Sequence, residues 1–319
     1  ILIGFYNHKQ VLSQIGLNQL QNNLNSAFNI AQSEYFLDYE NNRWMLIGSD
    51  NDSIRIKKMQ WGAYSLIHTE TKNSHHYLKQ CGLYGTTSTP DTAILVSDQS
   101  FPISLTGKIK LNGSCYFPKA GYKPVFIEGR SFNTTTPIHL FIRKAPVSLP
   151  RVKDDFILGI EKSISKFNPN TDSLINEIPN VLSNSFSAKT IIIEFTNIYL
   201  TSTQLTGNIK LISNNSIVIE NTNSLNNILI VASKVRVKKG FIGTLNIIAS
   251  DSIIIEEDCL LNYPSSLTVL NDQNKGNGIK GILIANKSVI YGSLICVNSK
   301  RVLEPNSYNV MVRLNADRE

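Results

Sequence analysis

A chain of 319 residues with 42% hydrophobic and 17% charged residues can bury a sizeable core, which excludes intrinsic disorder. The net charge of +7 is spread out, with 14 basic and 9 acidic residues up to position 150, and 17 and 15 beyond it. Because no basic block with interleaved aromatic residues stands out, we expect no nucleic-acid binding. Asn makes up about one residue in nine, so much of the polar surface is uncharged, which suits stacked turns and an extracellular setting.

The first six residues, Ile1 to Tyr6, are apolar and give way abruptly to Asn7, His8 and Lys9. Six residues cannot cross a bilayer, which takes about 20. They do resemble the interfacial end of a membrane span, with Tyr6 at the headgroup level. We therefore hypothesise a missing or cleaved N-terminal span, with a disordered or core-packed terminus as the alternative.

Residues 9–38 contain no proline and repeat apolar side chains at intervals of three and four, which predicts an amphipathic helix. The predicted apolar face comprises Leu17, Leu20, Leu24, Ala27, Phe28 and Ala31. Thirty helical residues would extend about 45 Å. The other faces carry Gln and Asn, so residues 1–40 are expected to form a stalk or anchor helix that packs against neighbouring structure.

Residues 41–90 are expected to form a small antiparallel β unit followed by a loop. Alternating apolar residues predict strands at 44–47, 53–57 and 63–68, and the polar residues 71–90 predict a connecting loop. Trp44, Trp61 and Tyr64 are expected to form the core of the small sheet. His75 and His76 in the loop are expected to be exposed to solvent.

The remaining residues, 91–319, are expected to form a β-solenoid with an interruption. Residues 105–111 recur almost letter for letter at 205–211, so the solenoid is expected to start near 93. Five prolines and a helix-like piece at 155–167 predict an excursion from the coil at about 131–188. The pair Asp154 and Asp155 is expected to begin a helix, where carboxylates are favoured by the helix dipole.

An 18-residue repeat dominates the second half of the chain. Three columns share this step: Ile217, Val235, Ile253 and then Val289; Ile219, Val237 and Ile255; Leu211, Leu229 and Ile247. Apolar residues that return at a fixed interval predict short strands stacked turn upon turn. The fold class is therefore mainly β, a parallel β-helix with about 18 residues per rung. Because glycine is sparse among the repeats, a right-handed coil is favoured over a left-handed one.

Two irregular places follow in the same half. Turn residues at 271–278 predict a loop that bulges from the coil, and residues 308–314 alternate like a last strand. The charged residues 317–319 would then protect the open end of the stack.

The period predicts which polar side chains lie on neighbouring rungs, about 4.8 Å apart. Lys238 should lie between Glu220 and Glu256, and Lys239 beside Glu257. A second column, Asn208, Asn226, Thr244 and Asn262, should form a hydrogen-bonded ladder. A structural role is favoured for the cluster Lys234, Arg236, Lys238 and Lys239, and a phosphate or lipid-headgroup site is the alternative.

The sequence predicts no catalytic, cofactor-binding or metal-binding residue. Cys81, Cys115, Cys259 and Cys296 lie far apart, so buried free thiols are favoured, with one disulfide as the alternative in an oxidising compartment. Asp251, Glu256, Glu257 and Asp258 are favoured as solvated turn acids over a hydrolase cluster. His139 lacks the Gly-rich hexapeptide context of acyltransferase solenoids, and no nucleophile-elbow, phosphate-loop or dinucleotide motif occurs.

The columns between Ile191 and Val297 resemble the bactofilin, or polymer-forming cytoskeletal, domain. Residues 105–129 also look like a segment of uncharacterised membrane-anchored proteins of Gram-negative bacteria, a family that brings no catalytic residues with it. The order of a stalk helix and a β-rich head is similar to that of type IV pilins. The early acidic residue of the pilin helix is missing, because position 5 is Phe5 and the first acid is Glu34.

We expect a non-enzymatic structural protein outside the cytoplasm, anchored in the membrane of a bacterial cell envelope through its N-terminal segment. It would self-associate or bind protein partners as a filament subunit or scaffold of a surface, secretion or pilus-like apparatus. One alternative is a carbohydrate-active or carbohydrate-binding β-helix, which requires the excursion to cover a cleft containing Asp154, Asp155 or Glu161. Another alternative is a bactofilin-like cytoplasmic scaffold.

Overall fold

The structure of the chain is a computed structural model with two compact units. It describes residues 2–33, 36, 42–47, 52–85, 92–96, 98, 100–106, 108–109, 114–126, 129, 131–134, 142–147, 154–164, 167–271, 281–298 and 311–314. The first unit comprises residues 1–85 and 155–319, and the second unit comprises residues 86–154.

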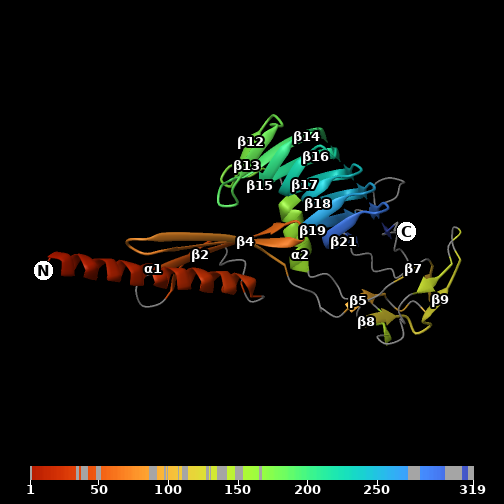
Figure 1. Ribbon diagram of the computed structural model, residues 1–319, viewed down its shortest axis with the longest axis horizontal. Coiled ribbons are helices and arrows are strands. Elements are labelled where there is room, and N and C mark those ends of the chain that lie inside the picture. Colours follow the sequence, from red (N-terminus) through yellow and green to blue (C-terminus); the bar gives the residue numbers. More distant parts are fainter. Residues whose placement is uncertain are drawn as a thin grey trace. The chain divides into compact units, whose positions relative to one another are not determined.

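The first unit begins with a long helix that packs on a four-stranded antiparallel sheet. Helix α1 (Leu2–Gln32) lies along the sheet formed by β1 (Trp44–Ile47), β2 (Asp52–Trp61), β3 (Tyr64–Lys72) and β4 (Tyr77–Tyr84), in that order (Figure 1). The predicted apolar face is confirmed in its later part, where Leu20, Leu24, Ala27 and Ala31 are buried. The last two pack with Ile54, Ile56 and Ile67 of the sheet.

The second unit contains short parallel strands. They are β5 (Thr92–Leu95), β6 (Ile103–Leu105), β7 (Lys108–Ile109), β8 (Ser114–Phe117), β9 (Tyr122–Pro124), β10 (Asn133–Thr134) and β11 (Ile142–Lys144). Strand β8 lies between β5 and β11, while β9 pairs with β6 and β10 pairs with β7, all parallel. Leu105, Cys115 and Phe117 form its buried cluster. The solenoid predicted to start near residue 93 is not confirmed here, because these strands pair in small sheets of their own and not in the sheet of the coil.

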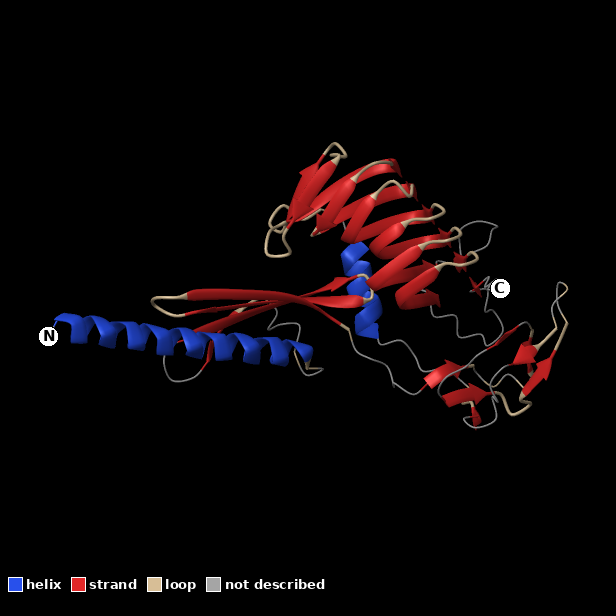
Figure 2. Cartoon of the chain, viewed as in Figure 1, coloured by secondary structure: helices blue, strands red, loops and turns tan. Residues whose placement is uncertain are grey.

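The rest of the first unit is a β-solenoid of about seven turns with about 19 residues per turn (Figures 1 and 2). Its strands are β12 (Asp172–Ile175), β13 (Val181–Asn184), β14 (Thr190–Leu200), β15 (Gln204–Gly207), β16 (Ile209–Ile219), β17 (Ser224–Val237), β18 (Ile242–Ile255), β19 (Leu260–Asn271), β20 (Gly281–Ile284), β21 (Val289–Asn298) and β22 (Met311–Leu314). All of their pairings are parallel.

The pairing divides each turn into three faces. The first face contains β13, β15 and the starts of β17, β18, β19 and β21. The second face contains β12 and, from the following turns, residues 190–195, 209–213, 228–232, 245–249, 265–270 and 292–298. The third face contains residues 197–200, 216–219, 234–237 and 252–255, followed by β20 and β22.

Two of the predicted columns are confirmed by the register of the strands. Ile217 pairs with Val235 and Val235 with Ile253, while Ile219, Val237 and Ile255 form the second file. All six side chains are buried inside the coil, where each aliphatic group stabilises the fold by about 1.5–3 kcal/mol.

The third predicted column is wrong. Leu211 pairs with Ile230, and Ile230 pairs with Ile247, while Leu229 pairs with Lys210 and Asn246. Register shifts at the corners of β16 and β17 change the local step from 18 residues, and a slip of one residue moves a side chain to the other side of a strand. Leu229 therefore lies on the outside of the second face.

The place predicted for Val289 is also wrong. Ile253 pairs with Ile282 of β20, and Val289 pairs with Leu260 on the first face. The reason is the long connection between β19 and β20, which delays the return of the chain to the third face. The predicted bulging loop at 271–278 lies outside the described residues from 272 onward, as do the charged residues 317–319.

Several predicted boundaries differ from those of the structure. The helix predicted at 9–38 spans 2–32, and residues 77–84 of the predicted loop form strand β4. Strand β2 extends to Trp61, so the turn that joins it to β3 comprises residues 62–63 instead of the predicted 58–62. Within the expected excursion at 131–188, β12 and β13 already pair with the coil, so its turns begin at 172. Prolines 169 and 179 beside these two short strands hide the repeat in the sequence.

The outside of the second face is covered by protein. Helix α2 (Asp154–Ile164) contributes Ile160, which is fully buried against a cluster that includes Ile192, Leu229 and Ile248 of the coil. The expected helix start at Asp154 and Asp155 is confirmed. The hairpin between β2 and β3 contacts the same face, because Trp61 is buried in this cluster and its Nε1 donates to the Asn227 carbonyl at 3.1 Å.

Candidate functional site

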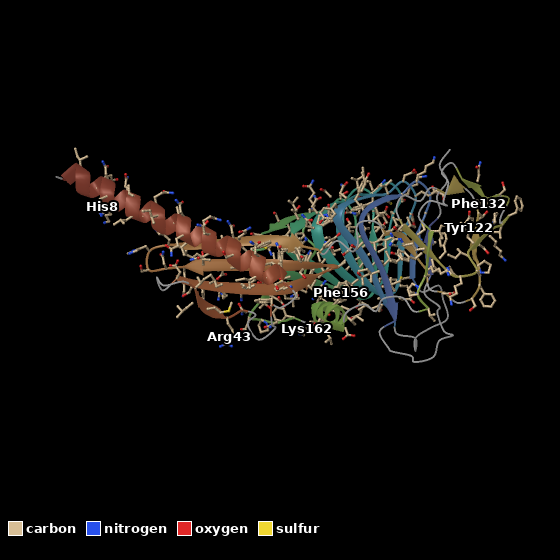
Figure 3. All side chains as sticks on the ribbon, turned by 90° about the horizontal axis from the view of Figure 1, so that it is seen from below. His8, Arg43, Tyr122, Phe132, Phe156 and Lys162 are labelled. Carbon is tan, nitrogen blue, oxygen red and sulfur yellow. The ribbon has the colours of Figure 1, made fainter. Side chains whose placement is uncertain are left out.

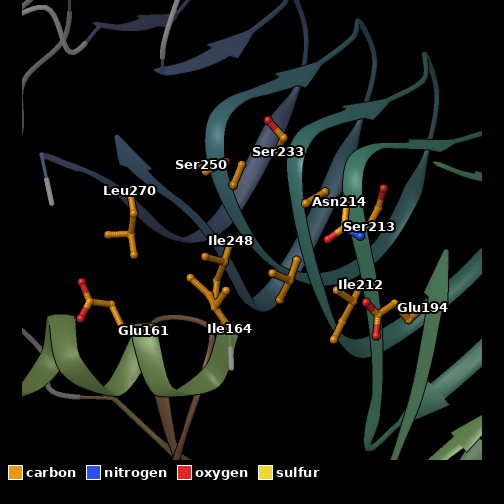
Figure 4. Close-up of a pocket in the computed structure, with 13 residues that line it drawn as sticks. Glu161, Ile164, Glu194, Ile212, Ser213, Asn214, Ser233, Ile248, Ser250 and Leu270 are labelled. Atoms are coloured by element: carbon orange, nitrogen blue, oxygen red, sulfur yellow. The ribbon is translucent and has the colours of Figure 1, made fainter. Parts of the chain in front are cut away.

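A groove of about 410 Å³ lies between α2 and the second face of the coil (Figure 4). It is lined by Glu161 and Ile164 of α2 and by Glu194, Ile212, Ser213, Asn214, Val231, Ala232, Ser233, Ile248, Ala249, Ser250 and Leu270 of the coil. A volume of this size is at the small end of ligand-binding pockets. The groove is the candidate functional site of the first unit.

The floor of the groove is one outward file of the second face. Glu194 pairs with Ile212, Ile212 with Val231, Val231 with Ile248 and Ile248 with Thr268. On an exposed solenoid face this file would carry polar side chains, because outward positions of a strand meet water. Its three central members are aliphatic, so the groove has an apolar floor that runs along the axis of the stack.

The far wall of the groove is the corner between the second and third faces. Small polar residues recur there once per turn, at Ser213, Ser233 and Ser250. The Ser213 hydroxyl donates to the Thr196 carbonyl at 2.7 Å, which satisfies a backbone group at the bend of the previous turn. This serine therefore holds the corner of the coil and is no free nucleophile.

Two carboxylates border the groove from opposite elements, Glu161 on α2 and Glu194 on β14, and both are exposed. Lys210, on the turn after Glu194, is buried to 7% exposure, and desolvation lowers the pKa of its amine while Asp172 and Glu194 oppose that shift. The charge of Glu194 is thus partly balanced by Lys210. Glu161 is the carboxylate best placed to meet a cation from outside.

The predicted lysine ladder is present in its C-terminal part. The Lys238 ammonium lies 3.3 Å from Glu256, and the Lys239 ammonium lies 2.9 Å from Glu257 and 3.3 Å from Asp258. Arg236 and Lys234 reach Glu256 and Asp251 at 3.6 and 3.5 Å. Glu220 instead accepts a hydrogen bond from the Tyr199 hydroxyl. These acids and bases neutralise one another along the turns, and each exposed pair contributes at most about 1 kcal/mol.

The predicted asparagine column is wrong at Asn208. Asn226 pairs with Thr244, but Thr206 occupies the place expected for Asn208. Asn208 is buried on the next face, where its side-chain oxygen accepts from Thr190 at 3.0 Å and its amide donates to the Ala188 carbonyl. Asn223 was missed, although its side chain bonds Leu200, Glu220 and Thr203 at a turn.

The aromatic residues expected to form the core of the small sheet have other roles. Trp61 and Tyr64 are buried, but they contact the coil, where the Tyr64 hydroxyl donates to the Ser265 carbonyl at 3.3 Å. Trp44 is 37% exposed, with the Arg55 guanidinium and the Lys72 ammonium 4.8 and 4.2 Å from the centre of its ring. The contact of the hairpin with the coil therefore accounts for the burial of Trp61 and Tyr64, and cation–π contacts account for the position of Trp44.

The remaining candidates do not converge. His75 is exposed, and His76 is half-buried, with its Nε2 3.3 Å from the Ser13 hydroxyl of α1. Asp155 is exposed at the start of α2 and is not among the residues that line the groove, and His139 lies outside the described residues. Among the described residues, no three His, Cys, Asp or Glu side chains form a cluster that could hold a metal ion.

The four cysteines are free thiols. Cys115 and Cys259 are buried, and Cys81 and Cys296 are half-buried. Burial raises the pKa of all four thiols, that of Cys81 to about 11. At neutral pH they are protonated and act as small apolar side chains.

A second exposed surface is the N-terminal half of α1, apart from the contact of Ser13 with His76. Figure 3 shows His8 on the part of the helix that extends past the strands of the small sheet. Five large apolar side chains of this half are exposed: Ile3 by 77%, Tyr6 by 62%, Val11 by 56%, and Leu12 and Ile15 by 55% each. In the part of the chain that the structure describes, no helix is both long and apolar enough to cross a bilayer.

Comparisons with family models, with curated proteins and with solved structures found no match to this chain. The resemblances to bactofilins and to membrane-anchored envelope proteins stay hypotheses, and the hand of the coil stays a prediction.

Proposed function

We propose that the protein is a non-enzymatic structural subunit that self-associates through the exposed half of α1. It would act as a filament subunit or scaffold of a bacterial surface, secretion or pilus-like apparatus. The observation that carries the proposal is the exposure of Val11, Leu12 and Ile15 on an ordered helix. Apolar side chains that gather on one side of a helix are normally covered by another surface.

The two sides of α1 support this proposal. At about 100° per residue, Val11 and Ile15 project from the side opposite to Leu20 and Leu24, which are buried on the small sheet, and Leu12 projects from the flank beside them. The intramolecular contact therefore does not extend to them. A helix that is half packed on its own sheet and half free is the layout expected of a subunit that joins others through the free half.

The coil supports a structural rather than a catalytic role. The acids that a β-helix hydrolase would need, such as Asp251 and Glu256, are engaged with Lys234 and Lys238 at the turns. The inside of the coil is a continuous aliphatic cluster. Such a stack is rigid in its middle, because each inner turn is hydrogen-bonded to the turns before and after it.

Self-association of the full chain tests the proposal. Sedimentation velocity at rising concentration, with electron microscopy of the same samples, should show oligomers or filaments, and L12S/I15S should shift the chain to monomer. The control V181S changes a side chain that is 69% exposed on β13 and should associate like the unchanged protein. A monodisperse monomer at high concentration would exclude the proposed function.

The same proposal has the protein at the cell envelope, facing the periplasm or the cell surface and anchored through its N-terminal segment. Fractionation of the cells that produce it, followed by protease treatment of intact cells and spheroplasts, tests this part. Recovery of the full-length product from the cytoplasmic fraction alone would favour the bactofilin-like scaffold.

One observation favours the carbohydrate alternative as a second candidate. Helix α2, from the expected excursion, borders a groove with Glu161, as that alternative requires. The groove floor is aliphatic rather than aromatic, however, and sugar rings bind best on aromatic faces. Calorimetric titration with envelope oligosaccharides tests the candidate, and binding that E161Q abolishes would support it.

A further inference from the structure

We infer that the groove beside α2 receives the exposed N-terminal half of α1 from a second copy of the chain. The inference rests on the proposed function and names the surface that the projecting helix would meet. The receiving surface consists of the residues that line the groove, and the inserted surface consists of residues 3–15 of α1. Both are described parts of the first unit.

The chemistry of the two surfaces matches. The groove offers Ile212, Val231 and Ile248 as a floor between two polar rims, and the helix offers Val11, Leu12 and Ile15 on one side. Covering both would remove apolar area from water at about 25 cal/mol per Å². The serines of the corner are small, so they leave room for a helix beside α2.

Their lengths also match. The groove crosses five neighbouring strands of the second face, β14, β16, β17, β18 and β19. Their four spacings of about 4.8 Å add up to about 19 Å. Residues 3–15 of a helix rise by about 18 Å. The floor runs along the axis of the stack, so a helix could contact one turn of the coil after another.

The charges are complementary. Helix α1 carries Lys9 and no acidic residue, since the first acid of the chain is Glu34. The charged residues that line the groove are both acids, Glu161 and Glu194. Lys9 precedes Leu12 by three residues and is therefore its neighbour on the helix surface. Because Lys210 already compensates Glu194, we assign Glu161 as the partner of Lys9.

The inserted and receiving surfaces are different patches of one chain. A contact of this kind is heterologous, and it forms an open chain of subunits unless a rotation closes it into a ring. The predicted assembly is therefore a linear polymer in which each α1 docks on the next coil.

A charge-swap experiment on the full chain tests the inference. The variants K9E and E161K should each weaken self-association about fivefold in sedimentation velocity, which corresponds to the loss of one exposed ion pair. The double variant K9E/E161K restores the opposite charges and should recover the original association constant. Glu177 is exposed outside the groove, so E177K should associate like the unchanged protein and serves as the matched control.

A steric variant supplies a second measurement that does not depend on charge. Ser250 is exposed on the rim, so S250W should fill the groove without disturbing the core and should block association. Circular dichroism checks that each variant is folded. If L12S/I15S abolishes association while S250W and the charge swap leave it unchanged, the receiving surface is wrong and the proposed function stands. If the unchanged chain stays monomeric, both the inference and the proposed function fail.

Discussion

At the scale of single residues, Gly62 fixes how the hairpin between β2 and β3 meets the coil. Its φ is +62°, and a Cβ there would lie 2.6 Å from the Asn246 Oδ1 and closer still to the Ser266 hydroxyl. The next residue, Ala63, donates its backbone amide to that hydroxyl at 2.9 Å, and the hydroxyl in turn donates to the Asn246 Oδ1 at 2.7 Å. The backbone can approach this polar pair because position 62 has no side chain.

We expect G62A to destabilise the first unit more than G240A does. Gly240 has a φ of +79°, but a Cβ there would make only an ordinary contact of 3.6 Å with Asn221. G240A should thus cost about 1 kcal/mol for backbone strain alone. G62A should cost a further 1–3 kcal/mol, roughly, for the clash with the coil. Urea unfolding monitored by tryptophan fluorescence measures both, and equal losses would contradict the docking of the hairpin.

His68 makes the stability of the small sheet depend on pH. Burial lowers the pKa of its imidazole below the ordinary value of about 6.5, although the nearby Glu70 opposes the shift. In the unfolded chain the imidazole therefore binds a proton at a higher pH than in the folded chain. Stability should accordingly fall as the pH drops through about 6.5 toward the folded pKa.

Urea midpoints at pH 7.5 and 5.5 check this expectation. H68Q should reduce the difference between the two midpoints, whereas H75Q, which changes an exposed imidazole, should leave it unchanged. A drop of the same size in H68Q and in the unchanged protein would assign the pH dependence to other groups.

At the scale of elements, α2 is held on the coil by one fully buried side chain. Ile160 has no exposed surface and packs in the cluster on the second face, while Leu158 of the same helix is 51% exposed. I160A should cost about 2–5 kcal/mol, because it removes buried methyl groups and leaves a cavity. L158A should stay within about 0.5 kcal/mol of the unchanged protein. Chemical denaturation distinguishes the two, and similar midpoints would show that α2 does not depend on this contact.

The sequence could predict the stack but only part of its register. The columns through Val235 and Val237 were readable because the third face keeps an 18-residue step. The column through Leu229 was not, because bulges at the corners shift the pairing and leave no mark in the order of residue types. Strand β4 was missed because its residues, such as Lys79, Gln80 and Gly82, have low strand propensity and pair with β3 through tertiary context.

A signal for the covered face was present in the sequence. Residues 191–193 and 228–232 are continuous apolar runs rather than alternating ones. Such runs are typical of strands buried on both sides. They predict that something covers the second face, but periodicity alone cannot name the covering element. The sequence places Glu161 in a cleft only on the condition that the excursion covers one. Ile212 and Val231 could be assigned to the groove only from the fold.

At the scale of the whole molecule, the ends of the coil should be its least protected part. Strands β16, β17 and β18 are hydrogen-bonded on both sides and carry the largest share of fully buried residues. Strand β12 closes one end and has a single neighbour, β14. In a stack of repeats, stability depends on neighbouring turns, so fraying starts at the termini.

Hydrogen exchange followed by mass spectrometry measures this gradient. Peptides from 209–255 should exchange slowest, peptides from 172–184 faster, and the two- to four-residue strands of the second unit should also exchange early. Equal protection of the backbone amides from β12 to β18 would contradict the expectation that unfolding starts at the ends of the coil.

The cover on the second face restricts how such a coil can lengthen by tandem duplication of its turns. A duplicate of residues 228–244, one full turn, would carry Leu229 and Val231 outward, and the eleven-residue α2 would have no side chains left to shield them. Insertions of whole turns should therefore be tolerated at the ends of the coil, beyond the reach of the helix, while the covered turns keep a fixed number.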